Sequence, residues 1–400
     1  MSEVVTTGSP GVTAARGFRA SGVTAGLKPS GRPDLAVVVN DGPLQVGAAV
    51  FTSNRVVGNP VLWSREVVRD GVVSAVVLNS GGANVATGPL GFQDTHRTAE
   101  LLAAELGISA GDVVVCSTGL IGVRLDHERL HAAVAPAVAA LSTEGGLAAA
   151  EAIMTTDTVP KTAHVTVTGP EGTWTVGGMA KGAGMLAPAL ATMLCVVTTD
   201  AVLDAAQADA ALRSATARTF DRVDSDGCTS TSDTVTLLAS GASGVRPEPE
   251  VFAEALRQVC QALARQLVAD AEGASHDIAV RVTGATSEEA AVAVARAVAR
   301  SNLVKAAFFG NDPNWGRIIA QVGTVPEDVA PFDAGSIDVT INGVQVCRAS
   351  SAHEDPATLD LAAEREVHVE IDLHAGQAEA TVWTNDLTHA YVHENSAYST

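Results

Sequence analysis

A threonine at a loop-to-strand junction is the residue of this 400-residue chain whose setting most favours chemistry. Residues 181–191 are mostly Gly, Ala and Pro, and an apolar run that predicts a strand begins at Thr192. The hydroxyl of such a residue can attack the carbonyl before it, here that of Ala191, so that the acyl group moves from N to O, an α-amine is freed and the ester is then hydrolysed. With a reference pKa of about 8, that amine can act as the base for the hydroxyl beside it. The alternative is a threonine that simply begins a core strand, and the residues alone favour that alternative.

Three glycine-rich segments also border predicted strands, at residues 79–84, 117–122 and 181–185. Tight turns are their simplest interpretation, and none of them has the Rossmann or P-loop spacing. A turn that combines Thr with Gly can in addition direct a hydroxyl and a backbone N–H at one point, which is what an oxyanion requires. Thr118 and Gly119 form such a pair.

A possible zinc motif lies at residues 127–131, where the sequence His-Glu-Arg-Leu-His matches H-E-x-x-H. Arg129 places a cation inside that motif, Pro136 distorts the predicted helix one turn later, and no third ligand is apparent downstream. The pattern therefore favours a solvated helix face over a metal site.

Composition and charge exclude several classes of partner. The formal charge of −20 repels a phosphate backbone and an anionic membrane surface, which argues against nucleic acid and membrane as partners. With 46% hydrophobic residues the chain can bury a sizeable core, as two or three domains or as one large α/β assembly. The most apolar window, residues 182–197, contains Pro188 and is too short to cross a bilayer, and no signal-peptide pattern is visible. We expect a cytoplasmic protein.

The cysteines argue against a zinc site, and the lysines are few enough to be considered one by one. The five cysteines are scattered and have no zinc spacing, which indicates buried reduced thiols. Of the 25 basic residues four are lysines, namely Lys28, Lys161, Lys181 and Lys305. In so Arg-biased a sequence each of these lysines merits a closer look.

The elements that must position these residues alternate between strands and helices, as in an α/β protein. In the first half, strands are predicted at 35–39, 48–51, 72–78 and 113–115, helices at 94–106 and 126–141, and a hairpin at 163–168 and 174–176. In the second half, helices are predicted at 204–220, 248–269 and 288–303, and strands at 277–283, 336–341, 344–347, 367–373 and 378–385. The C-terminal part is therefore strand-dominated, and a domain border is expected at about residue 285.

Ten collinear segments of the chain carry a family resemblance: 17–18 with 26–28, 51–55, 79–84, 117–122, 153–158, 181–194, 229–231 with 233–234, 271–274, 312–317 and 395–400. Through these segments the sequence resembles the bacterial glutamate N-acetyltransferase / ornithine acetyltransferase family, known as ArgJ, over nearly its whole length.

The resemblance implies roles for individual residues. Thr192 corresponds to a self-cleaving N-terminal nucleophile with the scissile bond at Ala191–Thr192, and Thr118 and Gly119 correspond to the oxyanion hole. The implied substrate-binding set is Thr158, Lys181, Thr192, Glu272, Asn395 and Thr400. An amino-acid substrate can present its carboxylate to Lys181 and its ammonium to Glu272.

Four positions depart from the family's usual pattern. Cys228 stands where an Asp is usual, Ser232 where an Asn is usual, Asn311 replaces an acidic residue, and Ser399 replaces a frequent Arg. None of these changes affects the implied nucleophile or oxyanion pair. Because Ser399 adjoins Thr400, it leaves the exact substrate preference open.

The resemblance further implies an α/β (α+β) protein with an αββα-layered, N-terminal-nucleophile-like fold of the ArgJ/DmpA type and a smaller strand-rich C-terminal domain. Self-cleavage would give an alpha chain, 1–191, and a beta chain, 192–400, associated as a heterotetramer with two of each. Acetyl would pass from N2-acetylornithine to Thr192 and on to glutamate in the cyclic route of arginine biosynthesis, without cofactor or metal. Acetyl-CoA is a further candidate donor.

Three alternatives stay open. An amidase or aminopeptidase with the same kind of nucleophile would use water as the acyl acceptor. A secondary-metabolism paralogue would use a related acceptor. A non-catalytic scaffold would have lost self-cleavage altogether.

Overall fold

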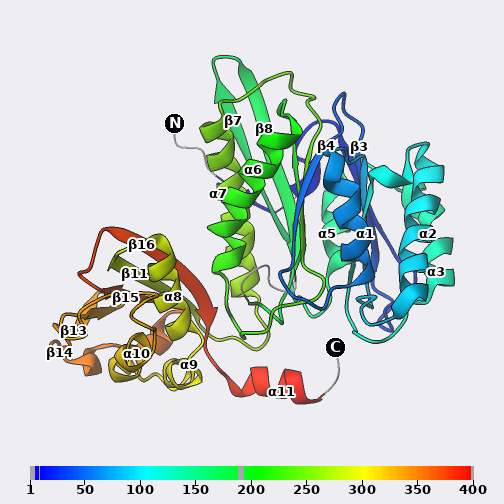
Figure 1. Cartoon of the computed structure of the whole chain (residues 1–400). Helices are drawn as coiled ribbons and strands as arrows, with labels where there is room; N and C mark the ends of the chain where they lie inside the picture. The colour runs from blue at the N-terminus through cyan, green and yellow to red at the C-terminus, as the bar shows by residue number, and fades with distance from the viewer. Residues whose placement is uncertain (1–4, 9, 188–192, 398–400) are drawn as a thin grey trace.

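The computed structural model describes residues 5–8, 10–187 and 193–397 of the chain. Within these residues the strands form three sheets, two of which lie face to face in a layered domain while the third belongs to a C-terminal domain (Figure 1). None of the described helices is long and apolar enough to span a membrane.

The first sheet of the layered domain has six strands in the order β1-β7-β8-β9-β10-β4. Its strands are β1 (Thr6–Thr7), β7 (Lys161–Gly169), β8 (Gly172–Lys181), β9 (Leu194–Thr199), β10 (Thr234–Ala239) and β4 (Val46–Phe51). All neighbours are antiparallel except β9 and β10. The register places Lys181, the last residue of β8, opposite Leu194, the first residue of β9.

The second sheet has four strands in the order β2-β3-β5-β6. These are β2 (Phe18–Val23), β3 (Leu35–Asn40), β5 (Ala75–Ser80) and β6 (Val113–Thr118). The parallel pair β5 and β6 ends together, with Ser80 opposite Thr118, so that both following turns lie at one edge of the sheet.

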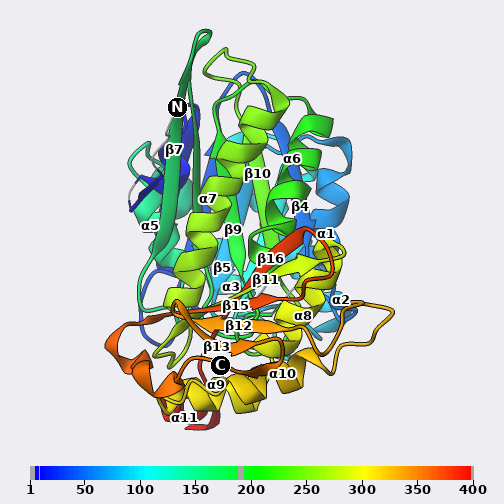
Figure 2. The same ribbon diagram turned by 90° about the vertical axis from the view of Figure 1, so that its left-hand side faces the viewer.

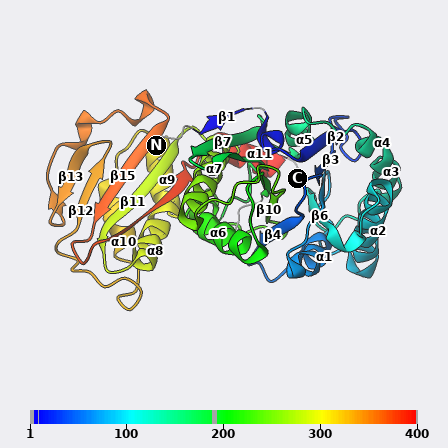
Figure 3. The same ribbon diagram turned by 90° about the horizontal axis from the view of Figure 1, so that it is seen from above.

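Helices cover the outer faces of both sheets, and Figure 3 shows these layers in succession. On the first sheet lie α6 (Ala205–Ala217) and α7 (Pro249–Ala269). The axis of α7 runs along the strands of this sheet (Figure 2). On the second lie α1 (Asn59–Val67), α2 (Gly88–Leu106), α3 (His127–Ala132) and α4 (Val134–Ala139). The remaining helix, α5 (Gly146–Ile153), packs against β2, β3 and β8. The arrangement confirms the predicted αββα layering.

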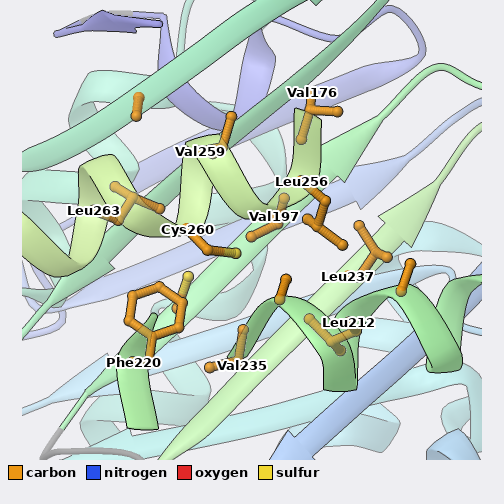
Figure 4. Close-up of a cluster of buried hydrophobic side chains, with 14 of the residues drawn as sticks. Val176, Val197, Leu212, Phe220, Val235, Leu237, Leu256, Val259, Cys260 and Leu263 are labelled. Atoms are coloured by element: carbon orange, nitrogen blue, oxygen red, sulfur yellow. The ribbon is translucent and has the colours of Figure 1, made fainter. Parts of the chain in front are cut away.

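Apolar side chains explain why these layers hold. Between the sheets, a cluster that includes Val38, Leu78 and Val196 is fully buried. Outside the first sheet, Val197 and Leu237 lie among the side chains of α6 and α7, part of which Figure 4 shows. Removing apolar area of this kind from water is the dominant favourable term in folding.

The C-terminal domain packs a six-stranded sheet against helices. In the order β14-β13-β12-β15-β11-β16, its strands are Ser351–Ala352, Val344–Arg348, Asp338–Ile341, Glu366–Asp372, Asp277–Ala285 and Ala378–Asn385. Its helices are α8 (Glu288–Ala299), α9 (Asn302–Phe309) and α10 (Trp315–Val322). The border expected at about residue 285 falls after β11, whereas β11 itself is a strand of this sheet, so the C-terminal sheet already begins at Asp277.

A last helix, α11 (His389–Ala397), takes the chain from the C-terminal domain back beneath the layered domain (Figure 1). The hydroxyl of Thr388, just before α11, donates to the carbonyl oxygen of Gly273 at 2.6 Å. Sequence patterns missed this helix, since they predicted a strand-dominated C-terminal part.

Several predicted boundaries were wrong. The helix predicted from residue 94 begins at Gly88, because Pro89 occupies the first turn, where its missing N–H costs nothing. The helix predicted over 126–141 is two helices, separated at Ala133 just before Pro136. The helix predicted over 288–303 ends at Ala299, and Ser301 caps a new one.

Candidate active site

A small cavity of about 70 Å³ lies where the ends of β6 and β8 meet α11 and the loop that follows α7. It is lined by Thr118, Gly119, Thr155, Thr156, Lys181, Gly184, Met185, Glu272 and Asn395. Five residues of the predicted site are therefore brought together from four distant parts of the chain: Thr118, Gly119, Lys181, Glu272 and Asn395.

Thr118 is the last residue of β6 and is buried. Its carbonyl oxygen accepts hydrogen bonds from the N–H groups of Gly81 and Gly82, each at 3.0 Å. Its hydroxyl oxygen accepts one from Lys181 Nζ at 3.3 Å. Because an ammonium can only donate, the proton of the Thr118 hydroxyl stays available for another acceptor in the cavity.

Gly119 follows with a φ of +126°, in a region that other residues rarely adopt. A Cβ at this position would lie 2.6 Å from the backbone nitrogen of Gly82. The turn therefore requires glycine both for its backbone conformation and for its close approach to the turn after β5.

Lys181 ends β8, and its side chain is almost completely buried. Burial lowers the pKa of this ammonium, while the negative charges of Asp157, Asp233 and Glu272 act in the opposite direction. The carboxylate of Asp157 lies 4.0 Å from Lys181 Nζ. A buried cation beside Thr118 can attract a carboxylate or a developing oxyanion.

Asp157 connects Lys181 to a second buried lysine. Its Oδ1 accepts from Lys161 Nζ and from the Gly182 N–H, both at 2.6 Å. Burial raises the pKa of Asp157, but the charges of Lys181 and Lys161 and these hydrogen bonds outweigh it and lower that pKa to about 2. Lys161 Nζ also lies 2.5 Å from a second carboxylate oxygen, Oδ2 of Asp270. Sequence reasoning missed Asp157 and Asp270, and the scarcity of lysine was the one signal that pointed to Lys161.

Glu272 and Asn395 close the cavity from the C-terminal half of the chain. Asn395 Nδ2, on α11, donates to Glu272 Oε2 at 3.0 Å. The Glu272 N–H donates to the Ala183 carbonyl oxygen at 2.9 Å. A side chain on Gly184 would lie 2.7 Å from the Glu272 carboxylate, so the loop after β8 packs closely on this acid.

Thr158 lies outside this cavity. Its hydroxyl donates to Asp270, and its N–H donates to the same carboxylate at 3.0 Å. Thr158 lines a neighbouring cavity of about 430 Å³ that shares Thr155 with the first one.

Ala191, Thr192 and Thr400 lie outside the described residues. The first described residue after Thr192 is Met193, whose N–H donates to Asp233 Oδ1 at 2.9 Å. Burial raises the pKa of the Asp233 carboxyl well above its ordinary value.

The H-E-x-x-H pattern forms part of α3, where the rings of His127 and His131 pack edge to face at 5.7 Å. Glu128 is exposed and Leu130 is buried, as on a helix with one solvated face. In the part of the chain that the structure describes, no group of three or more His, Cys, Asp or Glu side chains could hold a metal ion.

Nearly the whole chain is similar to proteins of one known family. A family model described as the ArgJ family matches residues 19–400. The chain is 61% identical over 388 residues to a Streptomyces avermitilis protein named arginine biosynthesis bifunctional protein ArgJ, covering 97% of this chain and 99% of that protein. A protein of the same name from Streptomyces coelicolor is 60% identical over 388 residues, with the same coverage of both chains.

Among solved structures, a chain of ornithine acetyltransferase complexed with ornithine, from Mycobacterium tuberculosis, is 51% identical. The match covers 48% of this chain and 100% of that chain, with a TM-score of 0.44.

Proposed function

The chain belongs to the ArgJ family, and on that premise we propose how its cavity transfers an acetyl group. It is an acyltransferase of arginine biosynthesis, and its relatives are named as bifunctional proteins of arginine biosynthesis. The reaction we assign moves acetyl from N2-acetylornithine to glutamate. A biosynthetic role of this kind fits the cytoplasmic location expected from the sequence.

The first event is self-cleavage at Ala191–Thr192. The Thr192 hydroxyl attacks the Ala191 carbonyl carbon, and the C–N bond breaks, so that the amide becomes an ester and the Thr192 α-amine is freed. Water then hydrolyses the ester, which releases the Ala191 carboxylate and restores the Thr192 hydroxyl. That amine then removes the proton from its own hydroxyl in each later cycle. The position of Lys181 supports this assignment, because Lys181 pairs with Leu194, which follows Thr192 by two residues.

Transfer then proceeds in two steps. Thr192 Oγ1 attacks the acetyl carbon of N-acetylornithine, the C–N bond breaks, and ornithine leaves with the proton that the α-amine carried. The α-amine of glutamate attacks the resulting ester, the C–O bond breaks, and the proton returns to Thr192. Each step passes through a tetrahedral oxyanion, for which we assign the free hydroxyl proton of Thr118 and the N–H of Gly119 as donors.

The remaining site residues bind the substrate. Glu272, held by Asn395, attracts the side-chain ammonium of ornithine, and Lys181 attracts the α-carboxylate. Thr158 and Thr400 complete the proposed set. The observation that carries this proposal is the single cavity that joins the oxyanion pair to one buried cation and one carboxylate.

Both fragments, 1–191 and 192–400, remain in one folded unit under this proposal. In the first sheet, β9 and β10 of the second fragment lie between β8 and β4 of the first. Separating the fragments would break the ladders on both sides, which supports a permanent association. Two such units would form the proposed heterotetramer, which size determination of the purified protein tests.

A donor and acceptor panel tests the function. Purified protein is given N-acetylornithine or acetyl-CoA, each with and without glutamate, and N-acetylglutamate and acetate are measured. We expect N-acetylglutamate from N-acetylornithine, and the relatives' description as bifunctional supports acetyl-CoA as a second donor. Acetate release that is indifferent to glutamate would indicate a hydrolase instead. Transfer only to another acceptor would indicate a paralogue.

A further inference from the structure

The two substrates of the proposed reaction make different demands on one site. Both have an α-carboxylate, but the side chain of ornithine ends in an ammonium and that of glutamate ends in a carboxylate. The cavity offers Lys181 for the shared carboxylate and Glu272 for the ammonium. A second cation is needed for the glutamate side chain, because the same pocket with Glu272 alone would repel it.

Two cationic side chains, those of Lys28 and Arg32, line the neighbouring cavity. It is lined by Lys28, Ser30, Arg32, Pro33, Glu151, Met154, Thr155, Thr158 and Pro160. It adjoins the first cavity at Thr155. Lys28 lies near enough to Lys181 and Asp157 for their charges to influence its pKa.

A fixed turn presents Lys28 to this cavity. The fully buried carboxylate of Asp34 accepts hydrogen bonds from the N–H groups of Ala25, Leu27 and Lys28 at 2.6, 2.5 and 3.0 Å. The same turn packs against Gly81, where a Cβ would lie 3.2 Å from the backbone of Leu27. Lys28 is therefore held beside the turn whose N–H groups bind the carbonyl oxygen of Thr118.

Within the described parts of the chain, no ion pair neutralises the charge of Lys28. Its Nζ donates to the carbonyl oxygen of Pro33 at 2.8 Å, and the Asp34 carboxylate is already occupied by backbone N–H groups. Among the described residues neither Lys28 nor Arg32 forms a salt bridge. One carboxylate, that of the exposed Glu151, lines the cavity with these two cations.

A rival cavity of about 340 Å³, which shares Glu272 with the first one, is less suited to an anion. Its Arg300 is paired with Asp224 at 2.7 Å, and the ammonium of Lys305 donates to the carbonyl oxygen of Ser225. Its walls also include Asp226 and Asp386. The cations there are matched by carboxylates, so a further carboxylate would gain little.

We propose that Lys28 binds the side-chain carboxylate of the acceptor glutamate and so determines acceptor specificity. The proposal rests on the transfer reaction assigned above and adds a residue that none of its steps uses. Glutamate would then span the two cavities, with its α-amine near the acetyl ester and its side chain directed past Thr155.

Two reactions catalysed by the same protein test this. One is transfer from N-acetylornithine to glutamate. The other is exchange of acetyl between N-acetylornithine and isotopically labelled ornithine, which needs no second carboxylate. Lys28→Met should raise the KM for glutamate about 10- to 100-fold, the usual worth of a charge-assisted hydrogen bond, and leave the exchange reaction unchanged. Lys28→Arg, which keeps the charge, should restore much of the glutamate affinity.

Arg300→Gln serves as the matched control in the rival cavity and should leave the KM for glutamate unchanged. An equal loss of both reactions in Lys28→Met, or a glutamate KM that rises in Arg300→Gln and not in Lys28→Met, would overturn the inference. If the wild-type protein makes no N-acetylglutamate, the proposed function itself fails. The two failures are therefore distinguishable.

The pH dependence gives a second readout. Burial, with smaller contributions from Lys181 and Arg32, lowers the pKa of Lys28 to about 8, against the opposing charges of Asp34 and Asp157. Lys28 therefore loses its charge as the pH rises through that value. The KM for glutamate, divided by that for ornithine in the exchange reaction, should rise in this range for the wild type and stay flat for Lys28→Arg. A flat ratio in the wild type would contradict the inference.

Discussion

Lys181 Nζ donates a hydrogen bond to Thr118 Oγ1 at 3.3 Å, although the two residues are 63 positions apart in sequence. The contact joins the ends of strands from the two facing sheets. It gives the threonine a fixed acceptor role toward lysine and leaves its proton free to donate. A positive charge beside that proton increases the stabilisation of an oxyanion in the cavity.

The Thr118 hydroxyl should matter most at the transition state. Thr118→Ala should lower kcat about 10²- to 10³-fold, as loss of one oxyanion donor does elsewhere. The KM for N-acetylornithine should change much less, because the full negative charge exists only at the tetrahedral stage. Steady-state kinetics measure both, and Thr118→Ser should recover most of the rate. A near-normal kcat with a raised KM would instead mean that Thr118 only lines the pocket.

Gly119 can be tested against a glycine of the same turn. Gly119→Ala should destabilise the turn by more than the roughly 1–2 kcal/mol cost of a positive φ, because its Cβ also meets the backbone of Gly82. Gly122 has a φ of +83° and no atom within 4 Å of a Cβ, so Gly122→Ala carries the backbone cost alone. The midpoint temperature of thermal unfolding and kcat should both be lower for Gly119→Ala than for Gly122→Ala. Equal behaviour of the two variants would contradict this account of the turn.

Asp157 should stabilise the protein through the two buried lysines. Asp157→Asn removes the negative charge that Lys161 and Lys181 share. The free energy of unfolding, measured by urea denaturation, should therefore fall by about 3–5 kcal/mol. Asp41→Asn, which breaks a half-exposed pair with Arg19, should cost about 1 kcal/mol or less.

The pH dependence of that difference has a definite sign. Because folding lowers the pKa of Asp157 from 3.8 to about 2, its contribution is complete above the higher value and is lost as the pH falls between the two. The stability gap between wild type and Asp157→Asn should therefore narrow in that range. A gap that stayed constant with acidification would mean that the charge of Asp157 contributes nothing.

Much of the layered domain could be predicted, because its strands are continuous apolar runs and its hairpin alternates around a Gly-Pro turn. The strand predicted at 35–39 and the hairpin of β7 and β8 are confirmed. By contrast, α11 has little apolar periodicity, and hydrogen bonds from Asn395 and from Thr388 just before it attach it to the loop after α7. Such a helix is fixed by tertiary contacts that local patterns do not contain.

The candidate site, like the fold, could be predicted only in part. Resemblance to a known family indicated Thr118, Gly119, Lys181, Glu272 and Asn395, which the structure brings to one cavity. The pair Asp157 and Lys161 has the spacing of an exposed helical ion pair, yet both side chains are fully buried. Lys161 also contacts Asp270, which lies just after α7 and 109 positions away in sequence, so a local pattern could not indicate this cluster.

The measurement that tests the central claim most directly is mass analysis of the purified protein before and after brief exposure to N-acetylornithine without glutamate. The account predicts two fragments, the second beginning with Thr192, and an acetyl group on the N-terminal peptide of that second fragment after exposure. Addition of glutamate should remove the acetyl group. Thr192→Ala should remain a single folded chain that takes up no acetyl, whereas Thr192→Ser should cleave at least in part. An uncut chain with full transferase activity, or acetyl carried by a residue other than Thr192, would contradict the account.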